Sequence, residues 1–250
     1  TTCKVLGAQE RIDIISQFTR PDQVAGKFSP DDRSSSIGLR ARDLVAPGRV
    51  LRIDDDELLV GGRYCKSFTV INYGKSASDK FLSKLNGLSY DIAVSMHVKP
   101  WAQQDAKAFA EQHYFVVSSE ARQYMRNHTN PEKGEFSDET NLPIRYLEDL
   151  AEAERLRDAV IVDEQHLFAL TTVITVFADT KSELDLAVGE VRQILNQRSM
   201  NEIESWSALR EDAFVATLPL GLQPLPYERN VTSEPLSYYI PFPSIEIMDP

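Results

Sequence analysis

The fold of this chain is decided by the segment Leu167-Phe168-Ala169-Leu170-Thr171-Thr172-Val173-Ile174-Thr175-Val176-Phe177-Ala178. A strand with one face in water alternates apolar and polar residues, whereas this segment is nearly apolar on both faces. It is also too short to cross a bilayer as a helix. We therefore expect a central strand that is covered on both sides by other parts of the protein.

Two more strands are predicted upstream of this segment. Residues 64–73 follow Glu57-Leu58-Leu59-Val60 across Gly61-Gly62, the dipeptide typical of a tight hairpin. Residues 90–98 alternate strictly, which predicts a half-buried strand. Its apolar face holds Tyr90, Ile92, Val94, Met96 and Val98, and the face expected to meet water holds Asp91, Ala93, Ser95, His97 and Lys99.

Helical periodicity appears in five stretches between and around these strands: 9–18, 76–85, 102–127, 144–159 and 180–197. The last of them begins with Thr180 followed by Glu183, the spacing of a capping box. A short strand at 203–206 and a short helix around Ala213 to Val215 follow it.

This order predicts two strand-helix-strand units, and hence an α+β fold of ferredoxin-like kind with an antiparallel sheet. Residues 1–40 are expected to form a helix and a connector. Residues 41–222 are expected to form the α+β domain, with a helical insertion at about 101–165. Residues 223–250 are rich in proline and are expected to form an extended tail or linker.

The charge of the chain is concentrated in one region. The formal net charge is −11, and residues 131–190 hold fifteen acids against five bases. Such a surface repels phosphate backbones, so direct binding of nucleic acid is not expected. The remaining composition, 42% hydrophobic and 26% charged, is that of a globular protein.

Known catalytic and metal-binding motifs are not complete anywhere in the sequence. Gly74-Lys75-Ser76 ends like a phosphate loop, but Thr69 occupies the position of its first glycine. His97, His113, His128 and His166 lie in separate predicted elements, and Cys3 and Cys65 lack the spacing of a metal knuckle. The acidic run at 54–57 lacks the ligand pattern of a calcium loop. From its residues alone, the chain is interpreted as a non-catalytic domain without metal or cofactor.

Six segments, in this order along the chain, resemble one known family. They are Asp43-Leu44-Val45-Ala46-Pro47, Leu59-Val60-Gly61-Gly62-Arg63-Tyr64, Met96-His97-Val98-Lys99-Pro100, Phe177-Ala178-Asp179-Thr180, Ala213-Phe214-Val215-Ala216-Thr217-Leu218-Pro219-Leu220-Gly221, and Arg229-Asn230-Val231-Thr232-Ser233-Glu234-Pro235-Leu236 running to Ile240-Pro241-Phe242. Together they resemble the N-terminal region of the large cytoplasmic ATPases of conjugative type IV secretion systems, the CagE/TrbE/VirB family.

The resemblance implies an N-terminal assembly domain that docks an ATP-driven motor for DNA transfer onto a membrane channel. It implies ATP and magnesium for the full-length protein, held by an ATPase core beyond Pro250, and none for this chain. Other channel components are the implied partners, with self-association through the ATPase core. The implied location is cytoplasmic, at the inner face of the cell membrane.

Three features are expected to contact a partner. They are the helix stripe Ile12, Ile15 and Phe18, the acidic residues Glu148, Asp149 and Glu152, and the tail residues Tyr238, Tyr239 and Phe242. Two alternatives stay open: a free-standing ferredoxin-like enzyme that uses His97 and nearby acids, and a protein-binding module unrelated to secretion.

Overall fold

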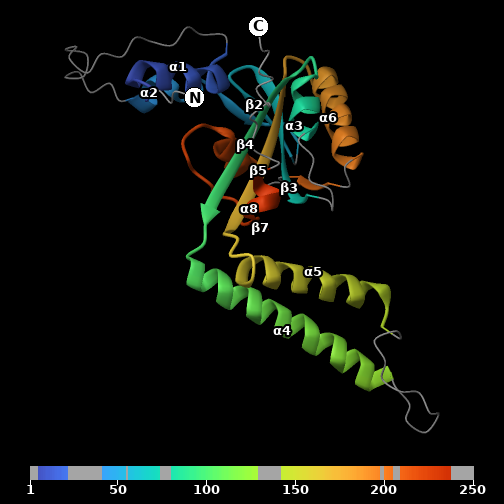
Figure 1. Ribbon diagram of the computed structural model, residues 1–250. Helices are drawn as coiled ribbons and strands as arrows, with labels where there is room; N and C mark the ends of the chain where they lie inside the picture. The colour runs from blue at the N-terminus through green and yellow to red at the C-terminus, as the bar shows by residue number, and fades with distance from the viewer. Residues whose placement is uncertain are drawn as a thin grey trace, which may run out of the picture. The chain divides into compact units, whose positions relative to one another are not determined.

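The structure is a computed structural model that describes residues 5–21, 41–54, 56–73, 80–128, 142–197, 200–204 and 209–237. Its chain forms two compact units (Figure 1). We call residues 1–97, 171–229 and 241–250 the sheet unit. Residues 98–170 with 230–240 form the second one, which we call the hairpin unit.

The described residues form a mixed α+β fold around one open sheet of seven strands. The strands are β1 (Val50–Arg52), β2 (Glu57–Val60), β3 (Arg63–Asn72), β4 (Asp91–Pro100), β5 (Leu167–Ala178), β6 (Asn201–Glu204) and β7 (Arg229–Thr232). The order is β1-β2-β3-β5-β4, with β6 paired to β3 and β7 paired to β5. β3 runs antiparallel to β2, β5 and β6.

The predicted central strand is confirmed, because β5 lies between β3 and β4 in the sheet and all its residues except Phe168 are buried. Ile174 is opposite Phe68 of β3, and both side chains are fully buried. Its neighbour Thr175 is opposite Ser67, and the two hydroxyl groups lie 2.7 Å apart. Hydrogen bonds of this kind compensate for removing the threonine hydroxyls of β5 from water.

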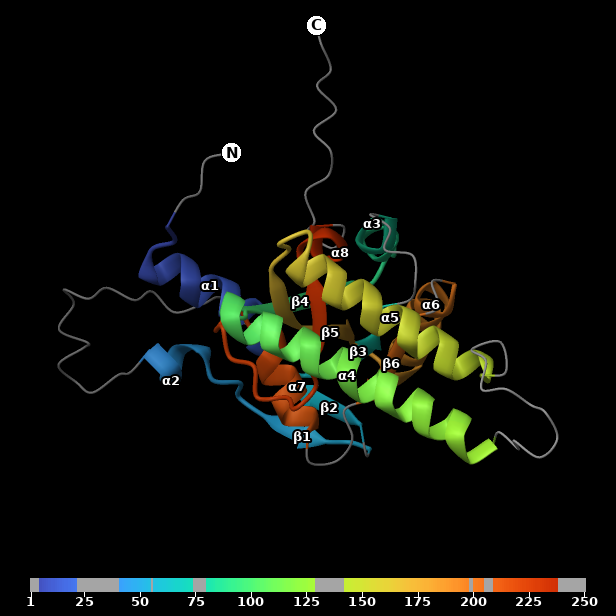
Figure 2. The ribbon, with the colours of Figure 1, turned by 60° about the horizontal axis from the view of Figure 1, so that its bottom comes forward.

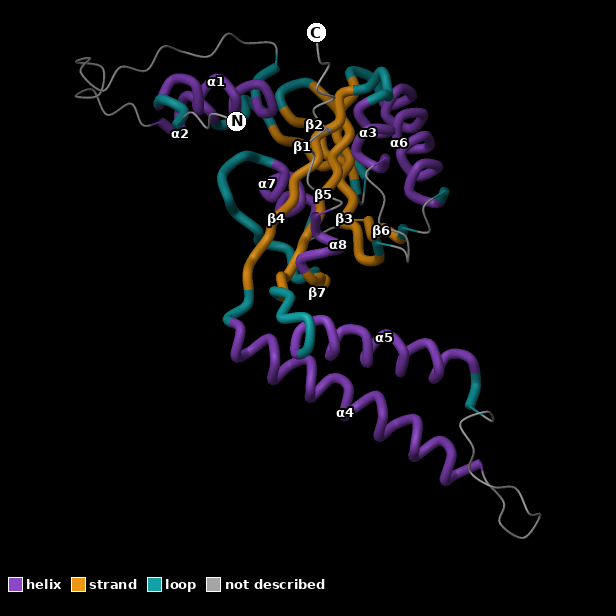
Figure 3. The backbone as a smooth tube through the Cα atoms, viewed as in Figure 1, coloured by secondary structure: helices purple, strands orange, loops and turns teal. Residues whose placement is uncertain are grey.

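Helices cover both faces of the sheet unit (Figure 3). On one face α6 (Lys181–Asn196) packs on β3 and places Arg192 over the ring of Phe68, and α3 (Lys80–Asn86) packs on α6. On the opposite face Phe214 of α7 (Arg210–Thr217) packs with Cys65 and Phe177 in one hydrophobic cluster. The predicted capping box of α6 is confirmed, since the Thr180 side chain accepts from Glu183 N while the Glu183 side chain accepts from Thr180 N.

The predicted glycine hairpin is also confirmed and meets the N-terminal helix. Gly61 has φ of +59°, and a Cβ there would lie 2.5 Å from the carbonyl oxygen of Thr19. Only glycine fits such a left-handed turn against another backbone. Thr19 ends α1 (Ala8–Thr19), and the next residue, Arg20, donates to the carbonyls of Asp43 and Ala46, joining α1 to α2 (Ala41–Val45).

The strand β4 differs from its predicted one-sided burial. Residues 92–97 are all half-buried, and Val98, expected on the apolar face, is 44% exposed. Ala93 packs against the hydrophobic cluster, and Ser95 and His97 hydrogen-bond to α7. The face of β4 that was expected to be exposed to water is therefore partly covered. Ala93 has apolar neighbours, and Ser95 and His97 have hydrogen-bond partners in α7. Pro100 is the last strand residue.

The hairpin unit consists mainly of two helices, α4 (Gln103–His128) and α5 (Ile144–Ile161), which lie side by side (Figure 2). Their bounds agree with the predicted helices at 102–127 and 144–159. Ala106 and Ala110 of α4 pack with Val160 of α5 in a small core. Farther along, Arg157 lies 4.2 Å from the ring of Tyr114. Small buried residues and aromatic contacts thus hold the helical insertion together.

The prediction that residues 223–250 form an extended tail is wrong for its first half. Arg229–Thr232 is strand β7, and Ser233–Ser237 is the short helix α8. Upstream of β7, Leu225 is buried, and Gln223 donates to the Thr171 hydroxyl. The prolines misled the sequence interpretation because they exclude long helices but not short elements that pack on the sheet. Residues 238–250 lie outside the described part.

Candidate functional site

Arg63 joins two of the segments that carry the family resemblance. Its Nε lies 3.0 Å from Asp179 Oδ1, and its second guanidinium nitrogen lies 2.7 Å from Asp91 Oδ2. The Arg63 side chain is 21% exposed, whereas both carboxylates are well exposed. Arginine suits such a position because its planar fork donates to two acceptors at once. Arg63 therefore ties together the ends of β3, β4 and β5.

His97 joins two other segments of the resemblance. Its Nε2 lies 2.7 Å from the carbonyl oxygen of Ala216, and Ser95 Oγ donates to the carbonyl of Thr217 at 2.9 Å. These carbonyls belong to the last turn of α7, where a helix lacks partners of its own. Nε2 donates this hydrogen bond, since a carbonyl can only accept. His97 is thus a cap for α7, and its prediction as a plain surface residue is wrong.

Replacing His97 by alanine is expected to lower the free energy of unfolding by about 1 to 3 kcal/mol, the cost of leaving a buried carbonyl unpaired. Ala216 is fully buried, so water cannot replace the imidazole easily. Urea unfolding measures the change, and Lys99→Ala, at an exposed position of the same strand, is the control. An unchanged stability would contradict the capping role of His97.

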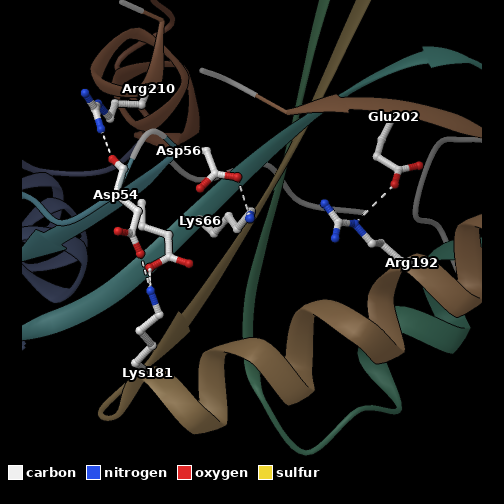
Figure 4. Close-up of polar contacts among 8 residues, drawn as sticks. Asp54, Asp56, Lys66, Lys181, Arg192, Glu202 and Arg210 are labelled. Carbon is white, nitrogen blue, oxygen red and sulfur yellow. Dashed lines mark hydrogen bonds and ion pairs between the residues drawn. The ribbon is translucent and has the colours of Figure 1, made fainter. Parts of the chain in front are cut away.

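The described residues of the acidic run, Asp54, Asp56 and Glu57, contact cations from three other elements (Figure 4). Lys181, at the start of α6, forms ion pairs with Asp54 and with Glu57, whose Oε2 is 3.1 Å away. Lys66 of β3 lies 2.5 Å from Asp56, and Arg210 of α7 donates to the carbonyl oxygen of Asp54. The run therefore anchors the turn before β2 to α6, β3 and α7.

Glu57 is the buried member of this group, with 4% of its surface exposed. Its Oε2 has no hydrogen bond of good geometry from the described residues, so the nearby Lys181 ammonium compensates its charge by proximity. The hydrogen bond to Asp54, followed by the contact with Glu57, raises the pKa of Lys181 above its ordinary value. Protonated lysine thus stays in place at all physiological pH values, and the group is interpreted as a structural anchor.

The described residues contain no group of three or more histidine, cysteine or acidic side chains placed to hold a metal ion. Residues 74–79, which include the phosphate-loop fragment with Lys75, lie outside the described part. Cys65 is described and is buried in the hydrophobic cluster.

The predicted contact stripe of α1 is turned toward the protein's own sheet unit. Ile12 is buried, and Phe18 packs against the hydrophobic cluster with its ring 6.0 Å from that of Phe177. Ile15 is half-buried. The stripe therefore helps to hold α1 on the sheet unit, and Ile12 and Phe18 contact the protein's own residues.

The predicted acidic contacts lie on the surface of α5. Glu148, Asp149 and Glu152 are all exposed, and Asp149 has a loose ion pair with Arg145 at 3.8 Å. Tyr238, Tyr239 and Phe242 lie outside the described residues. Of the two predicted contact features that lie within the described residues, the acidic face of α5 is the exposed one.

Sequence reasoning did not identify Arg63, Arg20 or Lys181 as anchoring residues. Their partners lie far away in the sequence, as for Arg63 and Asp179, so no local spacing points to them. For Arg63 one signal was present, since it directly follows the glycine pair in a segment of the resemblance.

No protein-family model and no curated protein sequence matches this chain. Within the part of the chain that the structure describes, no helix is both long and apolar enough to cross a membrane.

Proposed function

We propose that this chain is the N-terminal assembly and docking domain of a conjugative type IV secretion ATPase, peripheral at the inner face of the cell membrane. The observation that carries the proposal is that four of the six segments of the resemblance contact one another in two pairs. Arg63 pairs with Asp179, and His97 with Ala216, in each case more than a hundred residues apart. Segments that contact one another in the fold support a common origin better than isolated matches do.

We further infer that β3-α3-β4 and β5-α6-β6 are the two ferredoxin-like units. Across the sheet, these strands come in the order β6-β3-β5-β4. The two strands of each unit therefore have one strand of the other unit between them. α3 packs on α6, as expected when both crossovers have the same hand. The helical hairpin α4–α5 is then an insertion between β4 and β5.

The alternative of a free-standing enzyme requires His97 as an acid or base. Its Nε2 is already bonded to a backbone carbonyl inside the protein, which argues against that role. The second alternative, a protein-binding module unrelated to secretion, shares the docking surfaces and differs only in its partner.

The docking role predicts capture of this chain by the cytoplasmic segments of channel proteins. Reversing three charges, Glu148→Lys, Asp149→Lys and Glu152→Lys, is expected to weaken capture and to reduce its salt dependence. A control that reverses three exposed acids elsewhere, Asp163→Lys, Asp185→Lys and Glu228→Lys, makes the same change in net charge and should leave capture intact. Capture by no channel segment would contradict the docking role, and equal effects of both triple variants would contradict the α5 contact.

The proposal also predicts that the isolated chain neither binds nor hydrolyses ATP, because its phosphate-loop fragment lacks the first glycine. Isothermal titration calorimetry with ATP and magnesium should show no heat of binding. Micromolar binding that is lost in Lys75→Ala would contradict this prediction and assign nucleotide chemistry to the chain itself.

A further inference from the structure

The outer surface of α4 carries an exposed stripe that the hairpin unit does not cover. The helix packs side by side with α5 (Figure 2), and its buried residues are Ala106, Ala110, Ser118 and Ala121, of which Ala106 and Ala110 pack with Val160 of α5. On the surface away from these residues, Phe115 is 67% and Val116 43% exposed. Phe115 and Val116 are the exposed large apolar side chains of α4.

The stripe runs along most of the helix. At 100° per residue, its members lie within about 50° of a single line, which extends over roughly 30 Å. They are Asp105, Ala108, Gln112, Phe115, Val116, Ser119, Gln123 and Arg126, all exposed. The middle of the stripe is uncharged, and Ala108 and Ser119 are small enough for another helix to approach closely.

The charges of the stripe are divided between its two halves. Asp105 and, on one flank, Glu111 lie in the N-terminal half, whereas Arg126 and, on the same flank, Arg122 lie in the C-terminal half. No ion pair joins any of these four side chains to another described residue. Along the stripe and this flank, acidic residues thus precede the apolar centre and basic residues follow it, whereas the exposed Glu120 lies on the opposite flank.

This division makes the stripe complementary to itself in one orientation. In an antiparallel pair centred between Phe115 and Val116, Asp105 comes level with Arg126 of the other copy. Glu111 comes within about 3 Å, along the helix axis, of Arg122 of that copy, at a rise of 1.5 Å per residue. A parallel pair would place like charges together. Two-fold symmetric interfaces require such self-complementarity, because each contact occurs twice.

We propose that α4 is a self-association face on which a second copy of this chain packs antiparallel, with Phe115 and Val116 at the centre. The apolar centre supplies the buried area, and four ion pairs between the two copies set the orientation. The inference depends only on α4 and not on the function proposed above, since the stripe lies on a different helix from the acidic face of α5.

The test compares two variants of opposite charge by sedimentation equilibrium. Asp105→Lys with Glu111→Lys makes the stripe basic throughout, and Arg122→Glu with Arg126→Glu makes it acidic throughout. Wild type is expected to reach twice the chain mass of 28.2 kDa. Each variant alone should show a dissociation constant raised by about tenfold or more, since four ion pairs become four like-charge contacts.

An equimolar mixture of the two variants should regain the dimer, because a fully basic stripe then faces a fully acidic one. Combining all four changes in one chain should restore it as well. Circular dichroism verifies that each variant is folded, and Arg155→Glu, an exposed charge reversal on α5, should leave the dimer unchanged. A wild type that stays monomeric when concentrated, variants that dimerise like wild type, or a mixture that stays monomeric would each overturn the proposal.

Discussion

Replacing Leu184 by alanine is expected to lower the free energy of unfolding by about 2 to 5 kcal/mol, the range for a buried leucine. Leu184 begins the buried side of α6, the helix that packs on β3, and none of its surface is exposed. Removing its isobutyl group takes away apolar contacts and leaves a cavity that the close-packed sheet unit cannot fill. Urea-induced unfolding measures the loss.

A matched control lies two residues farther along the same helix. Leu186 is 65% exposed, so Leu186→Ala should change the free energy of unfolding by no more than about 0.5 kcal/mol. Both substitutions are identical in chemistry and in helix propensity, and therefore differ only in burial. Similar losses in the two variants would mean that α6 does not pack on the sheet as described.

Cys65 is expected to react with iodoacetamide about a thousandfold more slowly in the folded chain than in the unfolded chain at the same mildly alkaline pH. Burial raises the pKa of Cys65 from 9.0 to about 12, although the positive charge of Arg63 acts in the opposite direction. The reactive species is the thiolate, and its fraction below the pKa falls about tenfold each time the pKa rises by one. Labelling is measured by mass spectrometry in the Cys3→Ser variant, in which Cys65 is the remaining thiol.

The raised pKa of Cys65 also predicts a pH dependence of stability. Because the folded pKa lies above the unfolded value, the unfolded chain loses the thiol proton first as pH rises. The contribution of Cys65 to stability is therefore complete below pH 9.0 and is lost toward pH 12. The difference in unfolding free energy between wild type and Cys65→Ala should shrink across this interval. Rapid native labelling together with a constant difference would contradict the burial of Cys65.

Periodicity predicted the elements of the fold well wherever the pattern was long. The two-sided apolar segment became the central strand β5, and the predicted helices at 102–127 and 144–159 became α4 and α5. The glycine pair and the capping box were located from short spacings alone. These signals are local, because backbone sterics and the nearest neighbours in sequence produce them.

Predictions about surfaces were less successful. Ile12 and Phe18 were assigned to a partner, yet an amphipathic stripe looks the same whether it covers the protein's own core or that of another chain. His97 was assigned to water, and residues 229–237 to an extended tail. In each case the environment of the residue depends on which other segment packs against it. The residue pattern along one strand or helix does not contain that information.

By itself, therefore, the sequence determined the central strand, the hairpin and most helices. Only the tertiary structure decided which faces are covered, that Arg63 meets Asp91 and Asp179, and that the acids at 54, 56 and 57 are neutralised by Lys66 and Lys181. The physical reason is the range of the interactions. Periodicity follows from the geometry of a few neighbouring residues, whereas ion pairs and burial join residues that only the folded chain brings together.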